Sequence, residues 1–160
     1  MIEVKNLNKS FGNFKSLDNL SLNVKKGSVY GLVGPNGAGK TTFIKNLMGI
    51  YRPDSGSMTV NGEEVYENPA LKQKIIYISD DLFFFTTYSI LDTAKLYADI
   101  YKDWDWETFN KLKEIFKIDV KRKCCRLSKG MQKQVAFWLG ICTKPDLMVL
   151  DEPMDGLDPV

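Results

Sequence analysis

One stretch of nine residues has the composition of a phosphate-binding loop. It consists of Gly34, Pro35, Asn36, Gly37, Ala38, Gly39, Lys40, Thr41 and Thr42, and it matches G-x-x-x-x-G-K-[ST] at every fixed position. Glycine has no Cβ, so backbone N–H groups can come close to phosphate oxygens. In such a loop Lys40 places a positive charge at the β- and γ-phosphates, and the Thr41 hydroxyl coordinates Mg²⁺. We therefore predict a site for a nucleoside triphosphate with magnesium.

The segments on both sides of this loop have the patterns that would position it. Residues 29–33, Val-Tyr-Gly-Leu-Val, are predicted to form a buried strand, and residues 42–48 an amphipathic helix. The helix should begin near Gly39, so that the positive end of its dipole points at the bound anion.

Two adjacent carboxylates follow a second apolar strand. Residues 147–150 are predicted as a buried strand that ends in Asp151 and Glu152. Successive side chains of a strand point to opposite sides, so one carboxylate can face Mg²⁺ while the other faces a water molecule. A surface acidic pair is the alternative, and the four apolar residues before the pair argue against it.

A predicted helix N-terminus at Ser128 forms a third candidate site. The sequence Leu-Ser-Lys-Gly-Met-Gln at 127–132 opens a helix that extends to about Cys142, with Ser128 as its N-cap. A helix N-terminus with a capping serine and the nearby Gly130 can bind an anion.

The rest of the chain alternates between strand and helix patterns. Residues 2–9 and 17–25 alternate apolar and polar side chains, as in a small antiparallel sheet. In the loop between them Phe11 could stack on adenine, or it could be a hydrophobic plug. Further predicted elements are a strand and hairpin turn at 57–62, a short helix at 69–73, a central strand at 74–79 and two helices near 90–101 and 109–116.

The aromatic residues allow more than one interpretation. The apolar segment 82–85, Leu-Phe-Phe-Phe, could receive a partner helix or pack in the core. For Trp104 and Trp106 we expect packing rather than ligand contact.

Composition excludes several classes of protein. The 160 residues are 44% hydrophobic and 26% charged, which is typical of a globular domain, and the net charge of +2 does not indicate a nucleic-acid-binding face. The longest apolar run, 135–142, is too short to span a bilayer, and the first residues are no signal peptide. The three cysteines lack metal-site spacing, and histidine is absent. We expect a soluble cytoplasmic protein with reduced thiols.

Taken in order, the motifs resemble those of the ATP-binding subunit of ABC transporters, from Ile2 to Pro159. Walker A is 34–42, the signature is 127–131, Walker B is 147–151 followed by Glu152, and 155–158 resembles the D-loop. The resemblance implies an α/β fold: a P-loop NTPase core with a largely parallel sheet flanked by helices, an N-terminal antiparallel β-subdomain and an inserted helical subdomain at about 82–143. Residues 1–160 would form one ABC ATP-binding domain that is incomplete at its C-terminus.

The resemblance also implies an activity. ABC subunits hydrolyse ATP as a head-to-tail dimer and drive separate transmembrane permease subunits from the inner face of the membrane. Lys40 and the loop amides would hold the phosphates, with Lys40 also serving catalysis, and Glu152 would polarise the attacking water. Thr41 and Asp151 would hold Mg²⁺, with Asp80 as a third candidate metal ligand. Ser128 and Gly130 would contact the γ-phosphate across the dimer.

The chain departs from the family pattern in three places. Lys129 and Met131 replace the usual Gly and Gln of the signature, and Asp80 stands where a glutamine normally senses Mg²⁺ and the membrane partner. The chain also stops at Val160, before the strand and switch histidine that follow the D-loop in the family. We expect a fragment that hydrolyses ATP poorly. The alternatives are a soluble ABC ATPase acting in translation or on nucleic acid, a P-loop kinase, and a regulatory module without turnover.

Overall fold

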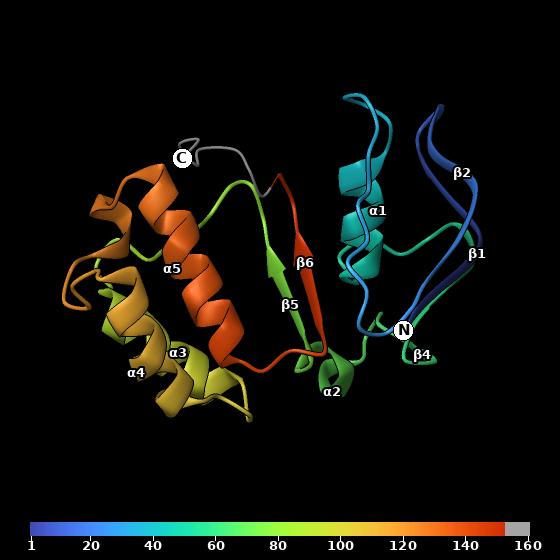
Figure 1. Cartoon of the computed structure of the whole chain (residues 1–160). Coiled ribbons are helices and arrows are strands. Elements are labelled where there is room, and N and C mark those ends of the chain that lie inside the picture. Colours follow the sequence, from blue (N-terminus) through green and yellow to red (C-terminus); the bar gives the residue numbers. More distant parts are fainter. Residues whose placement is uncertain (153–160) are drawn as a thin grey trace. The chain divides into compact units, whose positions relative to one another are not determined.

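The computed structural model describes residues 1–152, so the predicted D-loop at 155–158 lies outside the described part (Figure 1). The chain divides into two compact units. The first is Met1–Lys72, and the second begins at Gln73.

The first unit is built on an antiparallel sheet in the order β2-β1-β3-β4. Its strands are β1 (Ile2–Phe11), β2 (Phe14–Val24), β3 (Ser55–Val60) and β4 (Glu63–Glu64). Ile2 pairs with Val24 on one side and with Val60 on the other, and all three are buried. The predicted N-terminal antiparallel sheet is thus confirmed.

Two helices complete this unit. Helix α1 (Lys40–Leu47) buries Phe43, Ile44 and Leu47, as its amphipathic pattern predicts. The short helix α2 (Pro69–Lys72) follows the β3-β4 hairpin. In that hairpin Asn61 and Gly62 both have positive φ, 53° and 85°, the conformation required by a type I′ turn.

The predicted strand at residues 29–33 is wrong. The segment has no regular secondary structure, and Val29 and Val33 are 103% and 95% exposed. A strand needs a neighbour to pair its backbone N–H and C=O groups, and within residues 1–152 no strand is paired with this segment. The apolar composition was therefore not sufficient to form a strand.

The second unit contains a parallel pair of strands. β5 (Ile75–Ile78) pairs with β6 (Leu147–Leu150) from Ile75↔Leu147 to Ile78↔Leu150, as expected for strands from the parallel core. Helix α5 (Lys129–Cys142) packs on this pair through Gly140: a Cβ there would lie 3.4 Å from the Ile76 side chain. The mixed α/β fold that we predicted is confirmed.

Three helices share a core in this unit: α3 (Ile90–Ile100), α4 (Trp106–Phe116) and α5, with a 3₁₀ turn at Cys124–Arg126. Trp138 of α5 is fully buried and stacks on Phe109 and Phe116, with centroids 4.7 and 5.8 Å apart. Trp104 packs against this core and Trp106 contacts Trp104 and Phe109. Both rings therefore serve packing, as predicted.

All three cysteines are free thiols, and burial raises the pKa of Cys142 to about 12. Among residues 1–152 there is no cluster of potential metal ligands from His, Cys, Asp and Glu. In the same range, no helix combines the length and apolar character needed to cross a bilayer.

Candidate nucleotide-binding site

The phosphate-binding loop enters helix α1 through Gly39. Gly39 is the N-cap residue with φ 88°, a left-handed conformation, and a Cβ there would lie 2.5 Å from the Ser16 carbonyl oxygen. Gly37 also has positive φ, at 84°. Glycine is required at Gly39 both for the backbone conformation and for the close approach of β2. The predicted start of the helix is confirmed.

Lys40 folds back over its own loop. Its Nζ donates to the carbonyl oxygens of Gly34 and Pro35, at 2.7 and 3.1 Å. The ammonium therefore lies on the loop whose backbone would bind an anion. Phosphate oxygens could replace these carbonyls as acceptors, since charge-assisted bonds to a phosphate are stronger.

The two threonines after Lys40 differ in their surroundings. Thr41 is exposed, which leaves its hydroxyl accessible to a cation. The Thr42 hydroxyl accepts a hydrogen bond of 2.9 Å from Ser16 of β2. Ser16 was not identified from the sequence, because nothing in its own neighbourhood marks it as a partner of the loop.

Phe11 stands at the end of β1, half-exposed. Its ring makes an edge contact with Tyr51, with centroids 5.3 Å apart, and the Lys9 ammonium lies 5.6 Å from its centroid. The exposed part of the ring can accept a stacked base, while Tyr51 and Lys9 limit its orientation.

In the second unit, Asp151 extends the parallel pair by one residue. Its N–H donates to the Ile78 carbonyl at 3.0 Å, and its Oδ2 accepts a hydrogen bond from the Tyr77 hydroxyl at 3.2 Å. Burial, with the nearby Asp151 charge, raises the pKa of Tyr77 to about 12, so the phenol stays protonated near neutral pH. Tyr77 thus fixes one carboxylate oxygen and leaves the other available.

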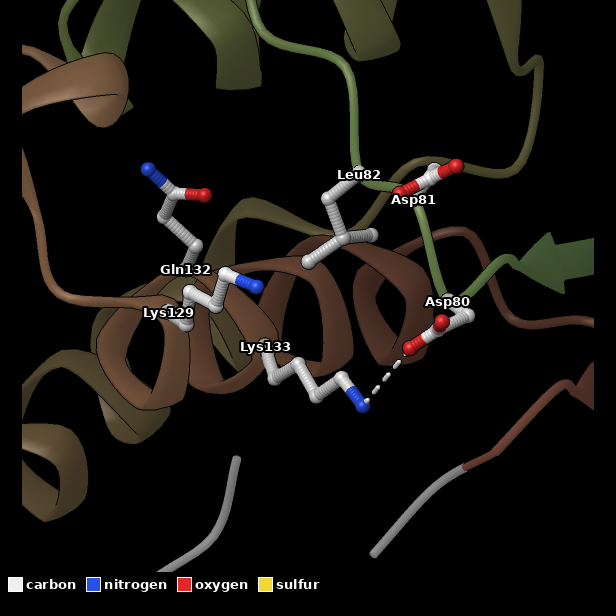
Figure 2. A pocket seen from close by; sticks show the side chains of 6 residues that line it. All are labelled: Asp80, Asp81, Leu82, Lys129, Gln132 and Lys133. Carbon is white, nitrogen blue, oxygen red and sulfur yellow. Dashed lines mark hydrogen bonds and ion pairs between the residues drawn. The ribbon is translucent and has the colours of Figure 1, made fainter. Parts of the chain in front are cut away.

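Asp80 lies in a small pocket that follows β5. Asp80, Asp81 and Leu82 line one part of it, and Lys129, Gln132 and Lys133 of α5 line the other (Figure 2). The Lys133 ammonium is 3.4 Å from Asp80 Oδ1 and donates to the Glu152 carbonyl at 2.7 Å. The Asp80 carboxylate is therefore engaged by a lysine.

Ser128 caps α5, as predicted. Its Oγ accepts from the Met131 N–H at 3.3 Å, and Gln132 donates to the carbonyls of Cys124 and Leu127. Gly130 lies in the first turn of the helix. This N-terminus presents backbone N–H groups of the kind that bind anions.

The structure brings the predicted residues together in two sets, one in each unit. Phe11 and residues 34–42 belong to the first unit, whereas Asp80, Ser128, Gly130, Asp151 and Glu152 belong to the second.

Two residues that support the site, Tyr77 and Lys133, were not predicted from the sequence. The sequence could have indicated Lys133. It precedes Ala136, Phe137 and Gly140 by three, four and seven residues, so a helix over this segment carries a lysine on its apolar face.

Comparison with known proteins identifies relatives along the whole chain. The ABC transporter ATP-binding protein YtrB of Bacillus subtilis is 35% identical over 160 residues, which are all of this chain and 55% of the relative. The bacitracin transport ATP-binding protein BcrA of Bacillus licheniformis is 32% identical, covering all of this chain and 53% of the relative. The chain thus spans about half the length of these curated relatives.

Solved structures show the same fold. A structure described as the ATP-binding subunit of an ABC transporter superposes with a TM-score of 0.89 at 26% identity, over 99% of this chain and 69% of that one. The family model described as ABC transporter matches residues 17–155. The chain therefore belongs to the ABC transporter family of ATP-binding proteins.

Proposed function

We propose that this protein is the ATP-binding and ATP-hydrolysing subunit of an ABC transporter. The observation that carries the proposal is the phosphate loop, with Lys40 held over glycine backbone at the start of α1. Lys40 and the amides of residues 34–42 bind the phosphates, and Phe11 stacks on the adenine.

Magnesium is a proposed cofactor, and the residue types fit it. Thr41 supplies a hydroxyl and Asp151 a carboxylate, and Mg²⁺ prefers oxygen ligands of both kinds. When bound, the ion would neutralise charge on the β- and γ-phosphates. Asp151 is suited to this role because Tyr77 orients its carboxylate.

Glu152 is assigned to polarise the attacking water. Its side chain is exposed at the end of the parallel pair, and its carbonyl is held by Lys133. Following the family resemblance, Ser128 and Gly130 contact the γ-phosphate of the ATP molecule that a second subunit binds in a head-to-tail dimer. That partner is a second nucleotide-binding subunit, either identical or different.

The transmembrane permease subunits are the other proposed partner, and they would hold the protein at the inner face of the cell membrane. Phe83 and Phe85 follow β5 and are 81% and 49% exposed, with their rings in edge contact. Exposed aromatic side chains of this kind favour a protein contact. Phe84, in contrast, packs against the helical core. An ABC ATPase acting in translation or on nucleic acid is less favoured, since the relatives are named for transport.

The test is a Mg²⁺-ATP titration by calorimetry, with Lys40→Ala as the binding control, followed by turnover in the full-length gene product. We expect binding that Lys40→Ala removes and turnover that Glu152→Gln removes. Binding that survives Lys40→Ala would reject the assigned phosphate site. Turnover that survives Glu152→Gln would reject the assigned catalytic carboxylate.

A further inference from the structure

Lys133 is a buried lysine. Only 6% of it is exposed, and it lies in the second turn of α5. Its ammonium donates to the Glu152 carbonyl oxygen at 2.7 Å and lies 3.4 Å from Asp80 Oδ1. Figure 2 shows the side chain extending from α5 toward Asp80. A buried ammonium is tolerated only where it is paired and hydrogen-bonded, and Lys133 has both kinds of partner.

These two partners follow the two paired strands. Asp80 lies two residues beyond β5, and Glu152 two residues beyond β6, whose last residues Ile78 and Leu150 pair with each other. Lys133 therefore connects three segments of one unit: the loop after β5, the end of β6 and helix α5. The last bond between the two strands, from the Asp151 N–H to the Ile78 carbonyl, stops one residue before Glu152 and does not involve α5.

The backbone of Glu152 gives this connection a specific consequence. Glu152 has φ 46°, in the left-handed region that residues other than glycine rarely adopt. The carbonyl that Lys133 holds belongs to this residue. The bond therefore restrains the backbone that carries the Glu152 side chain.

Among the charged groups at this site, Lys133 is the cation that pairs with Asp80. Asp80, Asp81 and Lys129 line the same pocket, and Asp151 is held by Tyr77. Within residues 1–152, the ion pair recorded for Asp80 is the one with Lys133. Asp80 has the geometry of a counter-ion for a buried lysine.

We propose that Lys133 is a positioning residue for Glu152, and that Asp80 serves as its counter-ion rather than as a metal ligand. The inference rests on the proposed function, since Glu152 is there assigned to polarise the attacking water. Lys133 acts through the backbone of Glu152 and touches neither ATP nor the attacking water.

The experiment compares Lys133→Met, Lys133→Arg and Asp80→Asn in the full-length gene product. Lys95→Met is the matched control, because Lys95 is an exposed lysine on α3 of the same unit. We expect Lys133→Met to lower kcat for ATP by about 10- to 100-fold, by analogy with the loss that follows removal of a hydrogen-bonding partner of a metal ligand. The Kd for Mg²⁺-ATP should stay within about twofold, since the phosphate loop is unchanged. Lys133→Arg should restore part of kcat, and Lys95→Met should have no effect.

A second readout does not depend on turnover. In protein labelled with ¹⁵N-lysine, the protected Lys133 ammonium should give an NMR signal that Lys133→Met removes and Asp80→Asn shifts. Calorimetry and thermal unfolding identify any variant that fails to fold. If Lys133→Met does not fold, kcat is compared between the unmodified protein and the Lys133→Arg and Asp80→Asn variants. The Asp80→Asn/Lys133→Met double variant should lose no more kcat than the worse single variant, because the two residues act as one unit.

The outcomes separate this inference from the proposed function. If the unmodified protein binds ATP without turnover, the proposed hydrolysis is wrong, and the positioning role is rejected with it. If the unmodified protein hydrolyses ATP and a folded Lys133→Met variant retains normal kcat, only the inference is overturned. Mg²⁺ affinity that falls in Asp80→Asn with an unshifted Lys133 signal would instead assign Asp80 to the metal.

Discussion

The Tyr77 hydroxyl donates a hydrogen bond to Asp151 Oδ2 across the parallel strand pair, at 3.2 Å. Tyr77 pairs in register with Val149, and its side chain reaches Asp151, two residues further along the chain and one residue past the end of β6. Strand residues two apart share a face, which explains why a tyrosine at this register can orient the carboxylate. The side chain that we assign to magnesium is thereby fixed before any ligand binds.

This relationship predicts the pH dependence of Tyr77. Burial and the Asp151 charge raise its pKa to about 12 from an ordinary value of 10.0. The protonated phenol is favoured in the folded state, so its contribution to stability is complete below pH 10 and is lost as the pH rises toward 12. NMR of ¹³Cζ-labelled tyrosine should show a Tyr77 signal that titrates well above pH 10. Burial also raises the pKa of Tyr97 and Tyr101, so mutation is needed to assign the signal. That signal should be absent in Tyr77→Phe. Titration of Tyr77 near pH 10 would contradict the buried hydrogen bond.

Gly39 and Gly31 provide a matched pair for the phosphate loop. Gly39→Ala places a Cβ 2.5 Å from the Ser16 carbonyl in a residue with φ 88°, whereas a Cβ at Gly31 meets nothing within 4 Å at an ordinary φ. A left-handed alanine alone costs about 1–2 kcal/mol, and the clash adds to this cost. We expect calorimetry to show Mg²⁺-ATP binding at least about tenfold weaker in Gly39→Ala, since 1.4 kcal/mol is a factor of ten. Gly31→Ala should bind normally. Equal affinities would show that the entry to α1 tolerates a Cβ.

Alanine substitutions at Gly56 and Gly62 distinguish the effect of close packing on stability from the effect of backbone conformation. Both have positive φ, 86° and 85°, but a Cβ at Gly56 would lie 2.3 Å from the Asn6 carbonyl of β1, and one at Gly62 would meet nothing within 4 Å. Gly62→Ala should lower the free energy of unfolding by about 1–2 kcal/mol through its backbone alone. Gly56→Ala should lower it further, because β1 and β3 must separate. Urea unfolding with comparison of m-values measures both. A smaller loss in Gly56→Ala than in Gly62→Ala would reject the close packing.

Local patterns predicted the elements that depend on local chemistry. Ser128 was identified as an N-cap, Asn61-Gly62 as a hairpin turn and Gly39 as the start of α1, because each follows from the preferences of one or two residues. The segment at 29–33 was predicted wrongly, since an apolar run forms a strand only when another strand pairs with it. Strand pairing is a property of the whole fold.

In the candidate site, too, the residues of local motifs were predicted, whereas their partners from distant segments were not. Lys40, Thr41, Asp151 and Glu152 were predicted from motifs whose spacing is local. Their supporting partners were not: Ser16 bonds to Thr42 from 26 positions away, Tyr77 to Asp151 from 74 and Lys133 to Asp80 from 53. No local pattern contains such pairs, because β2, β5 and α5 must first fold to create them.

Trp138 and Trp106 should respond very differently to the same change. Trp138 is fully buried, and its Nε1 donates to the Phe109 carbonyl at 3.0 Å, whereas Trp106 is 41% exposed at the start of α4. Trp138→Phe removes this bond from a carbonyl that, inside α4, also accepts the helical bond, and it opens a void between α4 and α5. We expect a loss of about 1–3 kcal/mol in the free energy of unfolding, from the lost hydrogen bond together with the void. Trp106→Phe keeps an aromatic ring at a partly exposed position and should stay within about 0.5 kcal/mol. Denaturant unfolding followed by circular dichroism measures both, and equal losses would show that the helical core does not depend on the Trp138 hydrogen bond.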